Sequence, residues 1–581
     1  MRHFRIYSFS GIEAHRDDAD RGSLRIAEGC VPAGAGGLRS APVFTEVGIV
    51  GNVSPDTDNH LTGNDDAENN TLIFSSRNGE VHDARLFKQA NTELGPFGTS
   101  YDVSVPVAGG QLYPDRPASM SAIGNNEVCW GDGSAEAITV GISPRTVAPN
   151  EILYHLEYAR FPKCRFFVIG PRKTIYAAGN PDEPLTVYIS EPADMQATHR
   201  DSMYTDEQLS QVKILMTDGH AITALSGGRD HVVVHTDGGA HLLKAPAPGQ
   251  ASTGYRVEQA PLSAASAAVN HNVVAGENGT YPFWLGFDGQ IYKDESGTRG
   301  PDNKDSYADP DQVSWMAKGR WDKELPIDLS KCFATYNPEL GIYWVFAENT
   351  DYANWVNAGS PADWATPPKY KSFIYSELAK SLSGPMVNNA LTTITSVDNS
   401  SEVIAVDQDN KILSANLDHF RDKDFPAVSD PWPDTTVNPG GRYVAADADG
   451  AFLYRGKYLS SPFAETQDGT GALNNPMYFE DASLAIAETA WMSLGDEHSE
   501  KQIHSIHLTF SSNSTGRVWA YIESDNGNVS GQYKGTITQK MKVFTNVRGV
   551  RFRVRLFVVA SEGHPWNLRE MVIGHLAGTT T

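Results

Sequence analysis

Short apolar segments separated by turn residues recur along most of this chain. The stretch ALSGGRDHVVVHTDGGAHLL (224–243) shows the unit clearly, because a β-branched run at 231–236 and a second apolar run at 240–243 flank Asp237, Gly238 and Gly239. Glycine supplies the positive φ that a tight hairpin turn requires. The pattern therefore predicts a β-hairpin rather than a helix.

The same plan recurs at irregular intervals of roughly 40 to 60 residues, a spacing typical of propeller blades. A four-stranded blade cannot bury both faces alone, but a ring of blades buries them against neighbours and leaves only short edges. The sequence therefore predicts an all-β fold with a β-propeller of six to eight irregular blades. The predicted hairpins lie at 71–87, 121–140, 164–190, 224–243, 271–294, 332–348 with 371–376, 395–415 and 443–459.

The end of the chain differs, because its apolar runs are longer and alternate cleanly. Such runs predict a small antiparallel sandwich, with strands at 502–510, 516–525, 549–560 and 568–576. We therefore expect an N-terminal arm or assembly segment at 1–45, a propeller at 46–460 and a C-terminal β domain at 461–581.

Two short helices are predicted as connectors between blades, at 204–215 and 309–321. Proline and small polar residues predict loops at 244–254 and 425–441. A further predicted loop, 349–370, carries Trp355 and Trp364. If these tryptophans are exposed they mark a partner contact, and if they are buried they anchor the loop.

The histidines of the hairpin at 224–243 raise the question of a metal site. His231 and His235 share one strand face but lie about 13 Å apart by the rise per residue. One zinc ion cannot bridge that gap. We therefore expect His220, His231, His235 and His241 to face solvent or a neighbouring segment, and we predict no metal or cofactor site.

The C-terminal residues from Lys501 onward differ in charge from the preceding part of the chain. The chain has 47 Lys and Arg against 71 Asp and Glu, a net charge of −24, whereas an open nucleic-acid-binding face is usually basic. From Lys501 onward there are ten basic and four acidic residues, a surplus of six. Within the run 549–560, Arg551, Arg553 and Arg555 are predicted to line one face. This ladder either meets an acidic partner or is a solvated outer face.

The four cysteines, Cys30, Cys129, Cys164 and Cys332, form no CxxC pair, and we expect buried, reduced thiols. The first twenty residues lack the apolar core of a signal peptide, and no run is long enough to span a bilayer. These features predict a protein made in a cytoplasm.

No sequence motif of a hydrolase, nucleotide-binding site or metalloprotease is present. Asp447, Asp449 and Gly450 imitate the start of a calcium loop, but Ala451 and Tyr458 occupy two ligand positions, so a turn is expected. Propeller glycosidases are the enzymatic alternative. The repeated S-x-D-x-G-x-T-W turn of sialidase-like members is missing, although a pair of catalytic carboxylates remains compatible with the sequence.

Three features resemble the nozzle, or tail tubular, proteins of short-tailed bacteriophages, including the packaged-DNA-stabilising proteins. These are the G-x-LR-x-x-P segment within the opening residues (36–42), the hairpins such as ITALSGGRDHVVVHTDGGAHLLKA, and the close, LGDEHSEKQIHSIHLTF followed by RGVRFRVRLFVVAS and WNLREMVIG. The resemblance implies a non-enzymatic virion protein of the tail, assembled in the host cytoplasm. It implies a homohexameric ring below the tail adaptor, or head-to-tail connector, with tail fibre or spike proteins as further partners.

In that family the ring retains packaged DNA and conducts it during ejection without sequence-specific binding. An acidic bore suits this task, because a basic lining would bind the phosphates and hold the duplex. Two alternatives stay open: a propeller that binds or cleaves glycans, and a cellular scaffold for protein complexes.

Overall fold

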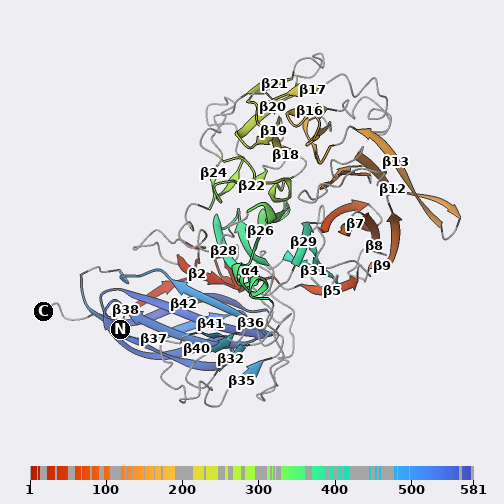
Figure 1. Ribbon diagram of the computed structural model, residues 1–581. Helices are drawn as coiled ribbons and strands as arrows, with labels where there is room; N and C mark the ends of the chain where they lie inside the picture. Colours follow the sequence, from red (N-terminus) through yellow and green to blue (C-terminus); the bar gives the residue numbers. More distant parts are fainter. Residues whose placement is uncertain are drawn as a thin grey trace.

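The computed structural model is all-β, and its strand ladders are antiparallel throughout the part of the chain that it describes (Figure 1). Side chains are described for much of 2–49, 164–189, 213–294, 311–417 and 485–577, with gaps inside these ranges. Strands between 59 and 161 and between 444 and 479 are described by their backbone alone. The prediction of an all-β fold is confirmed.

Successive groups of three or four neighbouring strands form small sheets along most of the chain. The first groups are β6 (Asn59–Asp66), β7 (Asn69–Asn78), β8 (Val81–Gln89) and β9 (Phe97–Ser104); β10 (Ser119–Gly124), β11 (Glu127–Gly131), β12 (Ala137–Ala148) and β13 (Glu151–Phe161); and β14 (Phe166–Ile169), β15 (Ile175–Ala178), β16 (Thr186–Ile189) and β17 (Lys213–Leu215). The next are β18 (Ile222–Gly227), β19 (His231–Thr236), β20 (Gly239–Lys244) and β21 (Arg256–Glu258); β22 (Phe283–Leu285), β23 (Ile291–Lys293) and β24 (Asp311–Gln312); β25 (Phe333–Asn337), β26 (Ile342–Glu348), β27 (Tyr370–Ser376) and β28 (Ser381–Met386); and β29 (Leu391–Ser396), β30 (Glu402–Asp407) and β31 (Lys411–Asn416).

The first strands of successive groups lie beside one another. Strand β6 contacts β10, β10 contacts β14, β14 contacts β18, β25 contacts β29, and β29 contacts β6 again. Between β18 and β25, the short 3-10 helix η5 (His271–Val273) contacts both neighbours. Strand β5 (Thr45–Ile49), from the start of the chain, pairs with β31 and completes the last of these sheets.

The two ends of the chain share a β-sandwich, at the lower left of Figure 1. One sheet combines the N-terminal strands β1 (Arg2–Ile6), β3 (Cys30–Pro32) and β4 (Leu38–Ser40) with β37 (Lys501–Phe510), β40 (Lys540–Gly549) and β42 (Asn567–Ala577). The other contains β2 (Leu24–Glu28), β36 (Ala482–Thr489), β38 (Arg517–Ser524), β39 (Val529–Thr536) and β41 (Phe552–Ser561). Strand β2 also pairs with β28, so it joins the sandwich to the sheet of β25–β28.

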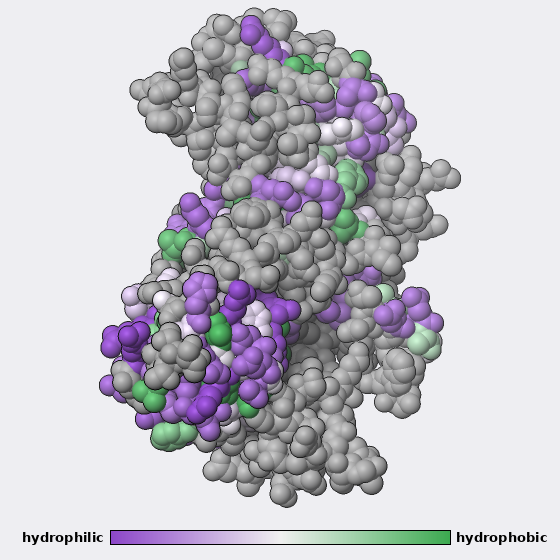
Figure 2. All heavy atoms as spheres, turned by 90° about the vertical axis from the view of Figure 1, so that its left-hand side faces the viewer, coloured by the Kyte–Doolittle hydropathy of each residue, from purple (hydrophilic) through white to green (hydrophobic). Residues whose placement is uncertain are grey.

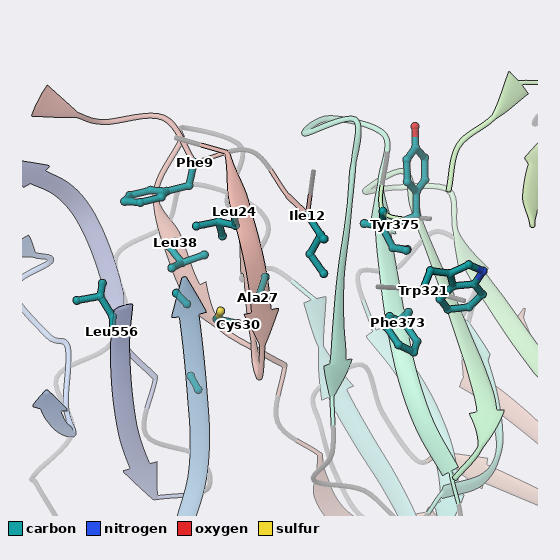
Figure 3. Close-up of a cluster of buried hydrophobic side chains, with 14 of the residues drawn as sticks. Phe9, Ile12, Leu24, Ala27, Cys30, Leu38, Trp321, Phe373, Tyr375 and Leu556 are labelled. Carbon is teal, nitrogen blue, oxygen red and sulfur yellow. The ribbon is translucent and has the colours of Figure 1, made fainter. Parts of the chain in front are cut away.

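The apolar core continues across this junction (Figure 3). Leu24 and Ala27 of β2 are fully buried between the two sheets, and Ile12 packs beside them. On the far side, Trp321 meets Phe373 edge to face, with ring centroids 4.6 Å apart. Burial of such large rings is the main source of stability at an interface of this kind, so the sandwich and the adjoining sheet are firmly joined.

A further small sheet precedes the sandwich and crosses the domain boundary expected at residue 460. Its strands are β32 (Val444–Ala446), β33 (Phe452–Tyr454), β34 (Lys457–Leu459) and β35 (Met477–Phe479). Strand β35 pairs with β32 although it lies beyond residue 460.

The predicted hairpins are confirmed, with one difference at the start of 271–294, where η5 stands before β22 and β23. Three local predictions are wrong. The end of the predicted helix 204–215 is strand β17, because Lys213–Leu215 pair with β16, and the start of 309–321 is strand β24, which pairs with β23. The predicted loop 349–370 begins with helix α4 (Thr350–Asn357). Gly359, two residues after the helix, has a φ of 80°, a conformation that glycine adopts readily at this place.

Candidate functional site

Of the two surroundings expected for the histidines of the hairpin β19–β20, solvent or a neighbouring segment, the structure shows the second: His231, His235 and His241 are buried. His235 is fully buried and packs against Trp284 of the next sheet, with ring centroids 5.0 Å apart and the ring planes tilted by 60°. Its Nε2 lies 3.1 Å from Ser226 Oγ, and its Nδ1 accepts a hydrogen bond from the Ala268 N–H at 3.2 Å. His235 therefore joins β19 to the segment that precedes β22.

A second histidine crosses the same junction in the opposite direction. His271 Nδ1 accepts a 3.5 Å hydrogen bond from the Leu225 N–H of β18, and its ring lies 5.2 Å from that of Phe166. Burial lowers the pKa of His235 to about 3 and that of His271 to about 4, with Arg165 adding to the second shift. Both rings are neutral at physiological pH, as acceptors of an N–H bond must be.

Asp218 organises the other face of the hairpin. It accepts hydrogen bonds from Thr236 Oγ1 at 2.7 Å and from the backbone N–H of His220 at 3.1 Å, and it lies 2.8 Å from His241 Nε2. Burial opposes ionisation of Asp218, but these hydrogen bonds outweigh it and lower its pKa. The network fixes the loop before β18 against strands β19 and β20.

The remaining histidines have separate carboxylate partners: His231 lies 2.8 Å from buried Asp294, and His220 lies 2.9 Å from Asp237 at the surface. Each ring thus has its own set of polar contacts. Within the described residues, no three histidine, cysteine or carboxylate side chains gather closely enough to hold a metal ion. The chemistry of this region is structural: it fastens neighbouring sheets to each other.

Two of the three arginines of the predicted basic ladder are paired inside the molecule. Arg553 donates to Glu488 at 2.9 Å and to Glu523 at 2.8 Å, while Arg555 donates to Glu488 at 2.6 Å. Glu488 is 1 % exposed, and Arg25 Nε lies 3.9 Å from it. The alternation predicted for Arg553 and Arg555 is present, but the strands on either side supply carboxylates to that face.

Arg551 does not continue the ladder. Strand β40 ends at Gly549 and β41 begins at Phe552, so Val550 and Arg551 lie in the connection between two strands, where the sequence predicted one strand from 549. The Asp525 carboxylate and backbone explain the break, because they bond to the Val550 N–H and the Arg551 carbonyl. Arg551 itself is exposed.

The two tryptophans singled out as partner contacts are not brought to a described surface. Trp355 lies in α4, whose backbone is described while this side chain is not, and Trp364 lies outside the described residues. Glu488, by contrast, was not singled out from the sequence. Its signal was visible, because it is the single charged residue of the apolar run 482–490.

The G-x-LR-x-x-P segment lies at the seam between the two ends of the chain. Leu38 and Arg39 of β4 are buried and pair with Leu568 and Asn567 of β42. Gly36 has a φ of 86°, and a Cβ there would lie 2.6 Å from the Tyr7 carbonyl oxygen. This turn requires glycine both for its conformation and for space.

Cys30, Cys164 and Cys332 are buried thiols that form no disulfide. Burial, and then the Glu28 charge, raise the pKa of the Cys30 thiol far above its usual range. A thiol of this kind is unreactive. The side chain of Cys129 lies outside the described residues.

Comparison with known proteins assigns no family. No family model matches the chain, and no curated protein matches it. The solved structure of Raptor from Chaetomium thermophilum is similar over 64 % of this chain and 29 % of that one, with 9 % sequence identity and a TM-score of 0.37. The chain thus spans less than a third of that structure, and a TM-score of this size assigns neither fold nor function. No helix in the described part of the chain is long and apolar enough to cross a membrane.

Proposed function

We propose that the chain is a β-propeller fused to a β-sandwich, and that six copies form the nozzle ring of a short-tailed bacteriophage. The small sheets are its blades. Their cyclic order of contacts, from β6 through β10, β14, β18, η5, β25 and β29 back to β6, supports seven blades around one axis. Strand β5, from the start of the chain, adds the fourth strand to the last blade, an arrangement that can hold the ends of a propeller ring together.

The observation that carries the proposal is the way the three resembling segments fit together. The G-x-LR-x-x-P segment and the final strand β42 pair directly, and the hairpin 224–243 belongs to one of the sheets in the cycle. Segments far apart in the sequence are thus parts of one framework. Pairing between the two ends of the chain stabilises the subunit against unfolding. A subunit of such a ring must stay folded while DNA passes through the channel of the ring.

The charge supports a conduit rather than a DNA-binding protein. Six copies at −24 carry 6 × −24 = −144. An acidic bore repels the duplex and keeps it mobile, whereas a basic bore would bind phosphates along its whole length. In this proposal the partners are the other five copies, the tail adaptor ring, and fibre or spike proteins, and the protein is located in the virion tail.

Sedimentation velocity and negative-stain electron microscopy of the full-length protein test the proposal. We expect a six-fold ring with an axial channel, at a mass six times that of the 63.2 kDa chain. A stable monomer that hydrolyses or retains glycans would contradict the nozzle and favour a glycan-specific propeller.

A further inference from the structure

The outer face of the sheet formed by β1, β42, β37 and β40 is basic in an otherwise acidic protein. Strand β40 alternates strictly, so Met541, Val543, Thr545 and Val547 are buried while their neighbours are exposed. The exposed positions are Lys540, Lys542, Phe544, Asn546 and Arg548. These residues were not singled out from the sequence, although the alternation of 540–548 was there to be seen.

The basic character extends across the sheet. Lys542 lies opposite His507 of β37, which lies opposite Val572 of β42, and Arg5 of β1 follows on the far side. In the next row, Gly574 has no side chain, and a Cβ there would lie 2.8 Å from Ser505 Oγ and 3.9 Å from His3 Nδ1. Burial and then the nearby Lys542 and His3 lower the pKa of His507, which places three cationic or ionisable groups near one another.

The exposed cations of β40 differ from Arg553 and Arg555, which have carboxylate partners on the neighbouring strands. The four strands contain seven Lys and Arg against one acid, Glu570, a balance of 7 − 1 = +6. One of the seven, Lys501, is buried and donates to the Ser499 carbonyl oxygen, so it does not belong to the exposed face. Glu570 lies 3.9 Å from Arg5. Among the described residues, no carboxylate lies within ion-pair distance of Lys540, Lys542 or Arg548.

Exposed apolar side chains lie among these charges. Phe544 is 61 % exposed with the Lys542 Nζ 4.8 Å from its ring centroid, and Leu576 of β42 is 42 % exposed. Figure 2 shows isolated hydrophobic residues on the largely hydrophilic surface of the lower lobe, which is the sandwich. Aromatic anchors within a polar rim are typical of protein interfaces.

We propose that this face docks on the acidic surface of a neighbouring copy of the chain, an inference that rests on the ring proposed above. Without these four strands the chain carries −24 − 6 = −30, so a basic sheet and a strongly acidic remainder belong to the same chain, and attraction between copies is favoured. A closed ring of more than two subunits needs two different surfaces in contact. The net charge also disfavours nucleic acid as the occupant, since a polyanion is repelled by the molecule as a whole.

The test compares three full-length proteins by sedimentation velocity at about 50 mM salt, where charge attraction is weakly screened. Wild type should sediment as a six-fold species, and K540E/K542E/R548E should lose roughly tenfold or more in association. The control R256E/K331E/K380E makes the same charge change on exposed side chains of other segments and should still assemble. A neutral variant, F544A, should also weaken assembly, and circular dichroism should show native β content in all variants.

The outcomes separate this inference from the proposed function. A six-fold K540E/K542E/R548E variant would overturn the docking face and leave the nozzle in place, whereas a monomeric wild type would overturn both. Dissociation of the control as well would mean general charge repulsion and would overturn the docking face. Binding of a fluorescent DNA duplex by wild type, lost in K540E/K542E/R548E, would assign the face to nucleic acid instead.

Discussion

His235 and His271 accept hydrogen bonds in opposite directions across one junction between sheets: His235 from the Ala268 N–H and His271 from the Leu225 N–H. The His235 ring is fully buried and His271 is partly buried, and each must be unprotonated at Nδ1 to accept its bond. Protonation of either ring would place a charge in the core and remove an inter-sheet contact. The junction is therefore sensitive to acid.

Acidification should weaken the fold before most carboxylates titrate. Burial lowers the pKa of His235 to about 3 and of His271 to about 4, so between these values and about 6.5 the unfolded chain binds protons that the native protein does not. Stability is thus lost as the pH falls from 7. At pH 5 the loss should be about 2 kcal/mol for each ring, measured as a fall in the free energy of unfolding in urea.

A variant isolates the contribution of one ring to this dependence. His235→Gln lowers stability at every pH, because its amide replaces the ring poorly against Trp284. Its free energy of unfolding should nevertheless change less between pH 7 and pH 5 than that of wild type. An unchanged slope would show that His235 titrates normally in the folded protein.

Glu488→Gln should destabilise the sandwich strongly. The substitution preserves shape but removes the buried charge that pairs with Arg553, Arg555 and Arg25. Breaking a buried ion pair in this way costs about 3 kcal/mol or more. Glu523→Gln is the matched control, because Glu523 is 27 % exposed and pairs with Arg553; it should cost about 1 kcal/mol or less. If the two variants lost equal free energy of unfolding in urea, Glu488 would not be the main partner of these arginines.

The buried thiols should be inert in the native protein. In a Cys129→Ser variant, which removes the cysteine whose surroundings are not described, Ellman's reagent should find no rapidly reacting thiol until denaturant is added. The physical reason is burial, which excludes the reagent and keeps the Cys30 thiol protonated. Rapid reaction of one thiol without denaturant would show that the core opens at that cysteine.

Hairpins could be predicted from the sequence because the information that specifies them is local. In the β19–β20 hairpin, the valines form the strand, Asp237 and Gly238 form the turn, and Gly239, with a φ of 151°, begins the next strand. The ends of strands are less local. Val550 and Arg551 continue the alternation of β41, but bonds to Asp525 hold them in a turn.

Pairing between strands that are far apart in the sequence could not be predicted from local patterns. Nothing in the residues around Ile6 indicates that β1 pairs with β42, more than 500 positions away in the chain. The arginine ladder shows the same limit. Its alternation was predicted from the sequence. Whether its arginines are paired depends on Glu488 and Glu523, which lie on the neighbouring strands, and the order of strands in the sheet cannot be read from the alternation.

Gly36→Ala should loosen the seam between the ends of the chain. The added Cβ would lie 2.6 Å from the Tyr7 carbonyl oxygen and 2.9 Å from the Ser8 Cα, and alanine is also strained at a φ of 86°. Gly359→Ala is the control, because its φ is 80° but no atom lies within 4 Å of the added Cβ, so it should cost only the backbone strain of about 1 kcal/mol. Hydrogen exchange at Phe4 and Ile6 should therefore accelerate in Gly36→Ala and stay unchanged in Gly359→Ala. Unchanged exchange in both would mean that strand β1 holds to β42 without the turn at Gly36.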